Sequence, residues 1–402
     1  MAYDIADNEI NVYEANDPST TLATITAPRI NTLKEIDQVS YLGDELVYDT
    51  MRVNASQELT IVGGSPVYDT QLIGFPYGSM FHHTNAGGGI DRTFFLDTSK
   101  QVGMYAYEYD AVSIIGMLDR QIFPGHVYNR IYFYSVLEEI VGASGTLFDY
   151  DCTNVSQVLI SGWIPYGTKR DALQQLLFAT NIHAFWDTTN QRVVFDYISH
   201  TVAGTIADAN IFDSGTVEYP QQATKIIVTE HAFFPYVTGN LVVAFDNSTG
   251  YALNGERVKF SNAPIIPSTI VTTGNITLSD ITSDSAVVTG RGIVQAYQYT
   301  HTTFQTERNA NVTDRKEYEV SVTNAYLISV LNSETVADRL ADYYFNRFVV
   351  KDGIKLNGEE CGKFYTLKDA FNVVRTGFLQ KMEKVYSSPF SLIPSLTTKR
   401  LK

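Results

Sequence analysis

Hydrophobic positions repeat with a helical period in three stretches of the chain and with a strand period in most of the rest. The clearest helix is predicted for residues 168 to 181, where Thr168 is a suitable N-cap and Asp171 follows three residues later. One face of this helix carries Ala172, Leu173, Leu176, Leu177 and Thr180. We expect the helix to stop at Asn181.

A β-hairpin is predicted directly after this helix. Residues 183–186 and 192–198 are rich in aromatic and β-branched side chains, which favour strands. The polar run 187–190 between them is suited to a turn. Helix and hairpin together form an α+β unit.

Two further helices are predicted from the same period. In residues 127–141 the apolar side chains share a face, and Gly142 provides a stop. In residues 334–348 the apolar side chains again fall on one side, and Ser333 is a suitable N-cap.

The remaining stretches read as short strands separated by Gly, Pro, Asn and Asp turns, for example residues 59–62, 225–229 and 239–245. At 402 residues the chain is long enough for two to four domains. We predict a mainly β fold with an α+β insertion. The predicted divisions are a β domain at 1–115, completed by part of 201–260, an α+β insertion at 116–200, a second β domain at 201–330, and a helix, strands and docking tail at 331–402.

Several motifs occur in an order that resembles a known family. They are residues 76–78 (PYG), 110–119 (DAVSIIGMLD), 124–128 (PGHVY), 162–179 (GWIPYGTKRDALQQLLFA), 337–344 (ADRLADYY), 358–362 (GEECG) and 376–379 (TGFL). In this order the chain is similar to the hub proteins of phage tails and phage-derived tail devices of Gram-positive hosts. The resemblance covers residues 75–200 and 335–385.

The resemblance implies an architecture and a role. Family hubs have two tube-like β-barrel domains plus smaller α/β domains, and three subunits form a ring at the tail tip that joins the tail tube to a spike or fibre. It therefore implies a virion structural protein, a homotrimer, in contact with a distal tail or tail tube protein, with a spike, fibre or cell-puncturing protein, and with a tape measure protein. DNA or the tail contents would pass through the ring.

Composition narrows the choice of partners. The 29 Lys and Arg against 44 Asp and Glu give a net charge of −15, which disfavours sequence-specific DNA binding and would suit an acidic lumen that DNA does not stick to. No apolar segment is long enough to span a bilayer, and the N-terminus lacks a secretory signal. We therefore expect synthesis in the host cytoplasm and no direct membrane span.

The search for chemistry gives no catalytic, cofactor-binding or metal site. His82 and His83 are adjacent on a predicted strand and so point to opposite faces, and the glycine-rich residues 85–89 lack the Lys-Ser/Thr of a phosphate loop. Residues 149–154 lack the Gly and Glu of a calcium loop. The pairs 138–139 and 359–360 are sequence neighbours, the usual arrangement of a helix face or loop. Cys152 and Cys361 are expected to be structural thiols.

Two rival functions remain open beside a non-enzymatic hub. One is a cell-wall hydrolase, although the sequence contains neither G-x-S-x-G nor H-E-x-x-H. The other is a receptor- or carbohydrate-binding module, since 26 Tyr and 22 Phe would suit an aromatic binding surface.

The last four residues, 399–402, are basic and follow an apolar run. They form either a solvated tail or a peg that docks on a neighbouring tail protein.

Overall fold

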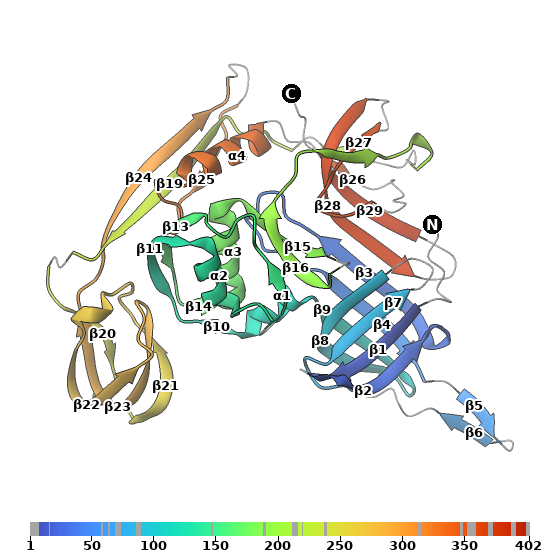
Figure 1. Cartoon of the computed structure of the whole chain (residues 1–402), viewed down its shortest axis with the longest axis horizontal. Coiled ribbons are helices and arrows are strands. Elements are labelled where there is room, and N and C mark those ends of the chain that lie inside the picture. The colour runs from blue at the N-terminus through green and yellow to red at the C-terminus, as the bar shows by residue number, and fades with distance from the viewer. Residues whose placement is uncertain are drawn as a thin grey trace.

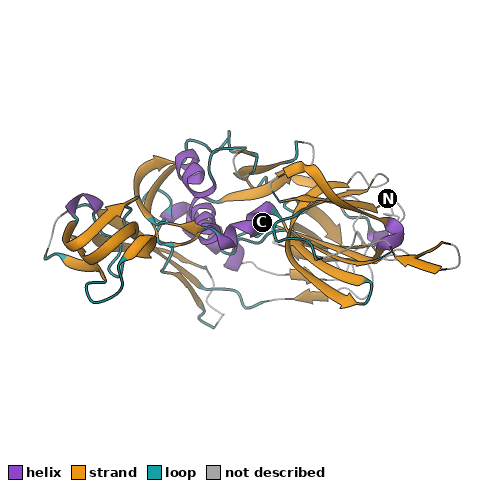
Figure 2. Cartoon of the chain, turned by 90° about the horizontal axis from the view of Figure 1, so that it is seen from below, coloured by secondary structure: helices purple, strands orange, loops and turns teal. Residues whose placement is uncertain are grey.

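The protein, seen in a computed structural model, is built mainly from β-sheets with four α-helices in its described part (Figure 1). The described residues are 8–15, 17–57, 59–62, 65–68, 74–85, 90–145, 148–187, 190–210, 216–218, 220–236, 239–311, 316–345, 349–351, 359–368, 373–386 and 391–398. Figure 2 shows strands at both ends of the molecule and most of the helices between them. The predicted fold class, mainly β with an α+β insertion, is confirmed.

Strands from both ends of the chain form one large sheet. Its pairing order is β18-β26-β29-β28-β3-β4-β9-β8-β7-β1-β2, with β27 joining β28 to β17. The N-terminal members are β1 (Asn8–Glu14), β2 (Asp17–Thr26), β3 (Ile30–Gln38), β4 (Thr50–Ser56), β7 (Met80–Asn85), β8 (Ile90–Gly103) and β9 (Ala106–Val112). The later members are β17 (Val202–Thr205), β18 (Thr216–Glu218), β26 (Val349–Lys351), β27 (Phe364–Lys368), β28 (Val374–Tyr386) and β29 (Ser391–Thr398). β5 (Leu59–Val62) and β6 (Ser65–Tyr68) form a separate hairpin.

The helical centre of the molecule lies between residues 114 and 197. Its elements are α1 (Ile114–Met117), β10 (Ile122–Phe123), β11 (His126–Tyr132), α2 (Phe133–Val141), β12 (Tyr150–Asp151), β13 (Leu159–Ile164), β14 (Gly167–Thr168), α3 (Lys169–Thr180), β15 (Ile182–Asp187) and β16 (Arg192–Tyr197). Short 3-10 turns occur at Ala27–Arg29, Leu118–Arg120, Asp208–Asn210 and Pro267–Thr269.

The helix and hairpin predicted for residues 168–198 are confirmed. Thr168 is the N-cap of α3, and its Oγ1 accepts a 3.0 Å hydrogen bond from the backbone N–H of Asp171. Asn181 ends the helix in the left-handed conformation at φ 60°. β15 and β16 then pair antiparallel.

The helix predicted for residues 127–141 is wrong in its first half. Residues 126–132 form strand β11, which pairs antiparallel with β13, and only Phe133–Val141 are helical. Val127, Tyr128 and Ile131 are β-branched or aromatic, so they suit a strand once a partner strand is present. Gly142 does end the helix, at φ 87°.

A third unit contains a three-stranded sheet, whose two long strands form a ribbon, with a helix on it. β19 (Lys225–Phe234) pairs with β24 (Thr300–Asn309) and β25 (Glu319–Val322), and α4 (Ser333–Phe345) lies against β19 and β24. Ser333 was predicted as the N-cap, but it is the first residue of the helix, and its hydroxyl donates to Glu230. Residues 346–348 of the predicted helix lie outside the described residues.

The β20 to β23 region forms a small sheet at one end of the molecule (Figure 1). β23 (Ser285–Ala296) is its central strand and pairs with β20 (Val242–Asp246), β21 (Leu253–Lys259) and β22 (Val271–Ser279). Its own core contains Phe260, Ile265, Val288 and Val294. The domain limits expected from the sequence stay predictions. In the described part of the chain, no helix is long and apolar enough to cross a membrane.

Candidate partner-binding site

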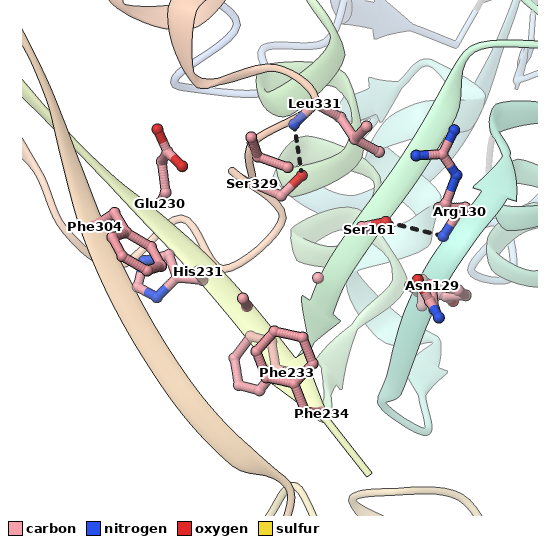
Figure 3. A pocket seen from close by; sticks show the side chains of 14 residues that line it. Asn129, Arg130, Ser161, Glu230, His231, Phe233, Phe234, Phe304, Ser329 and Leu331 are labelled. Atoms are coloured by element: carbon pink, nitrogen blue, oxygen red, sulfur yellow. Dashed lines mark hydrogen bonds between the residues drawn. The ribbon is translucent and has the colours of Figure 1, made fainter. Parts of the chain in front are cut away.

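A pocket lies between the β11–β13 pair and the β19–β24 ribbon. It has a volume of about 680 Å³. Figure 3 shows Asn129 and Arg130 on one side, Phe304, Glu230 and His231 on the other, and Phe233 and Phe234 below. A cavity of this size with mainly apolar walls and a few polar groups has the properties of a binding site.

Aromatic rings stack along the β19–β24 wall. Phe233 stacks on His301 with ring centroids 4.5 Å apart, and His301 stacks on His231 at 5.2 Å. Nδ1 of His231 lies 2.9 Å from Nε2 of His301, so one imidazole donates to the other. Burial lowers the pKa of both His231 and His301, which favours the neutral form of each imidazole.

The acidic residue of the pocket is already bonded. Oε1 of Glu230 accepts hydrogen bonds from Thr306 Oγ1 at 2.7 Å and from Ser333 Oγ at 2.8 Å. These bonds connect β19 to β24 and to the start of α4. Glu230 therefore holds the ribbon against the helix.

The opposite side of the pocket contains a bulge in β11. Between Tyr128 and Ile131 the register with β13 shifts, and Arg130 has a φ of 54°, which a residue with a side chain seldom adopts. The N–H of Arg130 donates a 2.9 Å hydrogen bond to Ser161 Oγ, drawn in Figure 3. This bond fixes the bulge at the edge of the pocket.

Next to the pocket, the motifs that carry the family resemblance meet the small sheet. Trp163 Nε1 donates to Asp284 Oδ1 at 2.8 Å, and the N–H of Tyr166 donates to Oδ2 at 3.1 Å. Thr282 and Ser285 donate to the Pro124 carbonyl at 2.9 and 2.8 Å. Asp284 is fully buried, and burial raises the pKa of its carboxyl, although the hydrogen bonds from Trp163 and Tyr166 oppose the shift.

Two motif glycines are required by this packing. A Cβ on Gly162 would overlap the carbonyl oxygen of Tyr326, and a Cβ on Gly125 would overlap the side chain of Asp284. Both glycines also have positive φ, at 134° and 82°. The motifs are thus explained by close packing between segments distant in sequence.

Arg339, in the motif of residues 337–344, joins α4 to α3. Its guanidinium donates to Asn181 Oδ1 and to the Phe178 carbonyl, both at 2.6 Å. It therefore satisfies carbonyl and amide oxygens at the end of α3. Burial lowers the pKa of Arg339 to about 10.

The histidines considered for chemistry are separated by the sheet. His83 is fully buried and its Nδ1 lies 2.6 Å from Glu35 Oε1, whereas His82 bonds Thr93 at 3.1 Å on the other face. Residues 86–89 of the glycine-rich loop lie outside the described residues. Within the described ranges, no group of three or more His, Cys, Asp or Glu side chains could hold a metal ion.

The other candidates also have structural partners. Asp151 accepts from the backbone N–H and the hydroxyl of Thr153, as in a turn, and Asp149 accepts from Ser144. Glu139 bonds His126 and Tyr128, and Glu360 pairs with Lys363.

Both cysteines are free thiols, as expected from the sequence. Cys152 is buried, and the pKa of both Cys152 and Cys361 is raised by burial.

Residues 391–398 form β29, between β28 and β26 of the large sheet. Residues 399–402 and Phe390 lie outside the described residues.

A buried ionic cluster that the sequence did not predict lies where β3 meets β28. Arg92 pairs with Asp37 and Asp49, and Lys384 lies 2.8 Å from Asp37. Burial alone would raise the pKa of Asp37, but the Arg92 and Lys384 cations lower it to about 2. These charges lie on β3, β8 and β28 and in the segment just before β4, with no common motif, so no local signal could have identified them.

Comparison with solved structures shows the same fold in three tail proteins, two of them from prophages. A tail protein from Neisseria meningitidis MC58 has a TM-score of 0.53 at 9% identity, with 98% of this chain and 96% of the other covered. The 43 kDa tail protein of prophage MuSo2 from Shewanella oneidensis has 0.54 at 8%, with 98% of each covered. Prophage tail protein gp18 from Listeria monocytogenes EGD-e has 0.51 at 11%, with 98% and 95% covered. No family model and no curated protein matches the sequence.

Proposed function

We propose that this protein is a structural hub at the tip of a phage tail or of a phage-derived tail device of a Gram-positive host. The observation that carries the proposal is the shared fold, which extends over 98% of this chain and over nearly the whole length of three tail proteins, two of them from prophages. The order of the sequence motifs supports the hub position. The large sheet and the β19–β24 ribbon are our candidates for the two tube-like β domains.

The hub forms a homotrimeric ring that joins a distal tail or tail tube protein to a spike, fibre or cell-puncturing protein, with a tape measure protein as a further partner. DNA or the tail contents pass through the ring. The net charge of −15 supports an acidic lumen, since like charges keep a phosphate backbone from adhering. A basic lumen in the assembled ring would contradict this part of the proposal.

Light scattering of the purified chain across a dilution series tests the hub. We expect a mass three times that of the 44.8 kDa chain, because a closed ring of threefold symmetry has a defined size. Antibody labelling of intact particles should then mark the tail tip. A chain that stays monomeric when tail tube and spike proteins are added, or a label along the whole tail, would rule out the hub.

The proposed role is not enzymatic. Three neighbours in the comparison are described as tail proteins, and the titratable groups considered for catalysis bond to neighbouring residues of the fold. Zymography on host cell walls tests this directly. A cleared zone produced by the purified chain would favour the hydrolase, and binding of the isolated chain to host cells would favour the receptor-binding module.

A further inference from the structure

Arg130, at the edge of the pocket, is a cation without a partner in the described part of the chain. Its guanidinium makes no hydrogen bond or ion pair with a described residue, and the neighbouring Asn129 amide makes none either. By contrast, Arg92, Arg308 and Arg339 are all bonded to carboxylate, amide or carbonyl oxygens. An unpaired guanidinium is well suited to bind a carboxylate, because its N–H groups match the two oxygens.

The fold holds Arg130 in this place at a conformational cost. The residue is in the left-handed region, and its N–H is bonded to Ser161. The acidic residue across the pocket, Glu230, has its Oε1 bonded to Thr306 and Ser333 and forms no ion pair with Arg130. The positive charge at the pocket edge therefore remains available.

The opposite part of the pocket is apolar and open. Phe304 is 64% exposed and Val330 is 81% exposed, and both line the cavity (Figure 3). Beyond it, Tyr236 is 64% exposed and stacks on Phe234. An apolar surface that continues past the cavity indicates a ligand longer than one small molecule.

We infer that this pocket binds a peptide segment of another tail protein in which an aromatic side chain lies next to an Asp or Glu. The aromatic ring packs against Phe233 and Phe304, and the carboxylate binds Arg130 and Asn129. The acidic residue of the segment is placed at the β11 edge, because the exposed Arg130 guanidinium there has no partner among the described residues. The inference rests on the proposed function only for the source of the segment.

The test compares two peptides that differ in one charge, Ac-Gly-Phe-Asp-Gly-NH2 and Ac-Gly-Phe-Asn-Gly-NH2, titrated onto the full-length protein and followed by ligand-observed NMR. We expect the Asp peptide to bind about two- to fivefold more tightly, the range for an ion pair with an exposed guanidinium. Arg130→Gln should abolish this preference, Arg130→Lys should restore part of it, and Phe304→Ala should weaken both peptides. Arg291→Gln, an exposed arginine on β23, is the matched control and should leave both affinities unchanged.

Equal binding of the two peptides, no binding of either, or a preference that persists in Arg130→Gln would each overturn the inference. A peptide whose only effect is to change the mass of the assembly would also overturn the inference. The occupant of the pocket would then be a second copy of the chain, which the peptide displaces. The mass of the peptide-free protein is measured on the same samples. A mass that differs from that of a trimer would contradict the hub proposal, whereas the peptide affinities test the pocket. The two failures are thus distinguishable.

Discussion

The indole Nε1 of Trp163 donates a 2.8 Å hydrogen bond to Oδ1 of Asp284, which lies 121 residues later in the chain. The same carboxylate accepts from the Tyr166 N–H and from Ser283 Oγ at 2.6 Å. Since Asp284 is fully buried, these bonds replace the water that the carboxylate has lost. The small sheet is thereby fixed to the helical centre of the molecule.

Asp284→Ala should loosen this junction. Trp163 Nε1 and the Tyr166 N–H would lose their acceptor in a buried site. We therefore expect the free energy of opening of the small sheet to fall by about 2 to 3 kcal/mol. Hydrogen exchange of the β23 amides measures that free energy. Asp246→Ala is the control, because the Asp246 side chain is exposed and, among the described residues, accepts its hydrogen bond from the nearby Ser248. Equal protection in both variants would contradict the role of Asp284.

Gly162→Ala should be far more damaging than Gly145→Ala. Both glycines have positive φ, at 134° and 83°, but only at Gly162 would a Cβ overlap another segment, the Tyr326 carbonyl. Around Gly145 there is no atom within 4 Å of the Cβ position. We expect Gly145→Ala to cost about 1 kcal/mol from backbone strain, and Gly162→Ala to cost several times as much. Thermal unfolding of the two variants side by side tests this, and similar midpoints would show that β13 can move away from Tyr326.

The elements that could be predicted from the sequence are those with local signals. Thr168 with Asp171 marks the start of α3, and Asn181 marks its end, so the bounds were predictable from residues in or next to the helix. Residues 126–132 are different, because their apolar spacing also fits a helix and the deciding factor is the partner strand β13, about thirty residues later.

The candidate site could not be predicted because no segment contains it. Its walls come from β11, β13, β19, β24 and residues 329–331, which only the tertiary fold brings together. Asp284 likewise has no motif around it that indicates a bond to Trp163. The glycines of the motifs were visible, but the atoms that forbid a side chain there belong to distant parts of the chain.

Arg92→Leu should destabilise the junction between the two ends of the chain. It would leave Asp37 and Asp49 buried without their shared partner, which costs about 3 to 5 kcal/mol in comparable buried pairs. Urea unfolding measures the change in free energy. Arg52→Leu is the control, because Arg52 pairs with Asp110 in a largely exposed position and should contribute less than about 1 kcal/mol. Similar losses in both variants would mean that the cluster is not important for stability.

Acid should destabilise the protein partly through His183. This residue is 4% exposed, and burial, with a smaller effect of the Arg339 cation, lowers its pKa to about 3. In the unfolded chain the pKa of a histidine is about 6.5, so between these values the unfolded state binds the extra proton. The stabilisation is therefore complete above pH 6.5 or so and is lost as the pH falls towards 3.

His183→Phe removes this proton uptake while keeping a ring in place. Between pH 7 and pH 5 we expect the wild-type protein to lose about 2 kcal/mol more unfolding free energy than the variant, as measured by urea titration at both pH values. Phe185→Leu is the control, since Phe185 contacts His183 at a ring separation of 6.2 Å but does not titrate. It should lower stability equally at both pH values, because it changes packing alone. If wild type and His183→Phe lose the same unfolding free energy on acidification, His183 takes up its proton in the folded state as readily as in the unfolded chain. The packing of α3, β15 and α4 around His183 would then be too loose to exclude water.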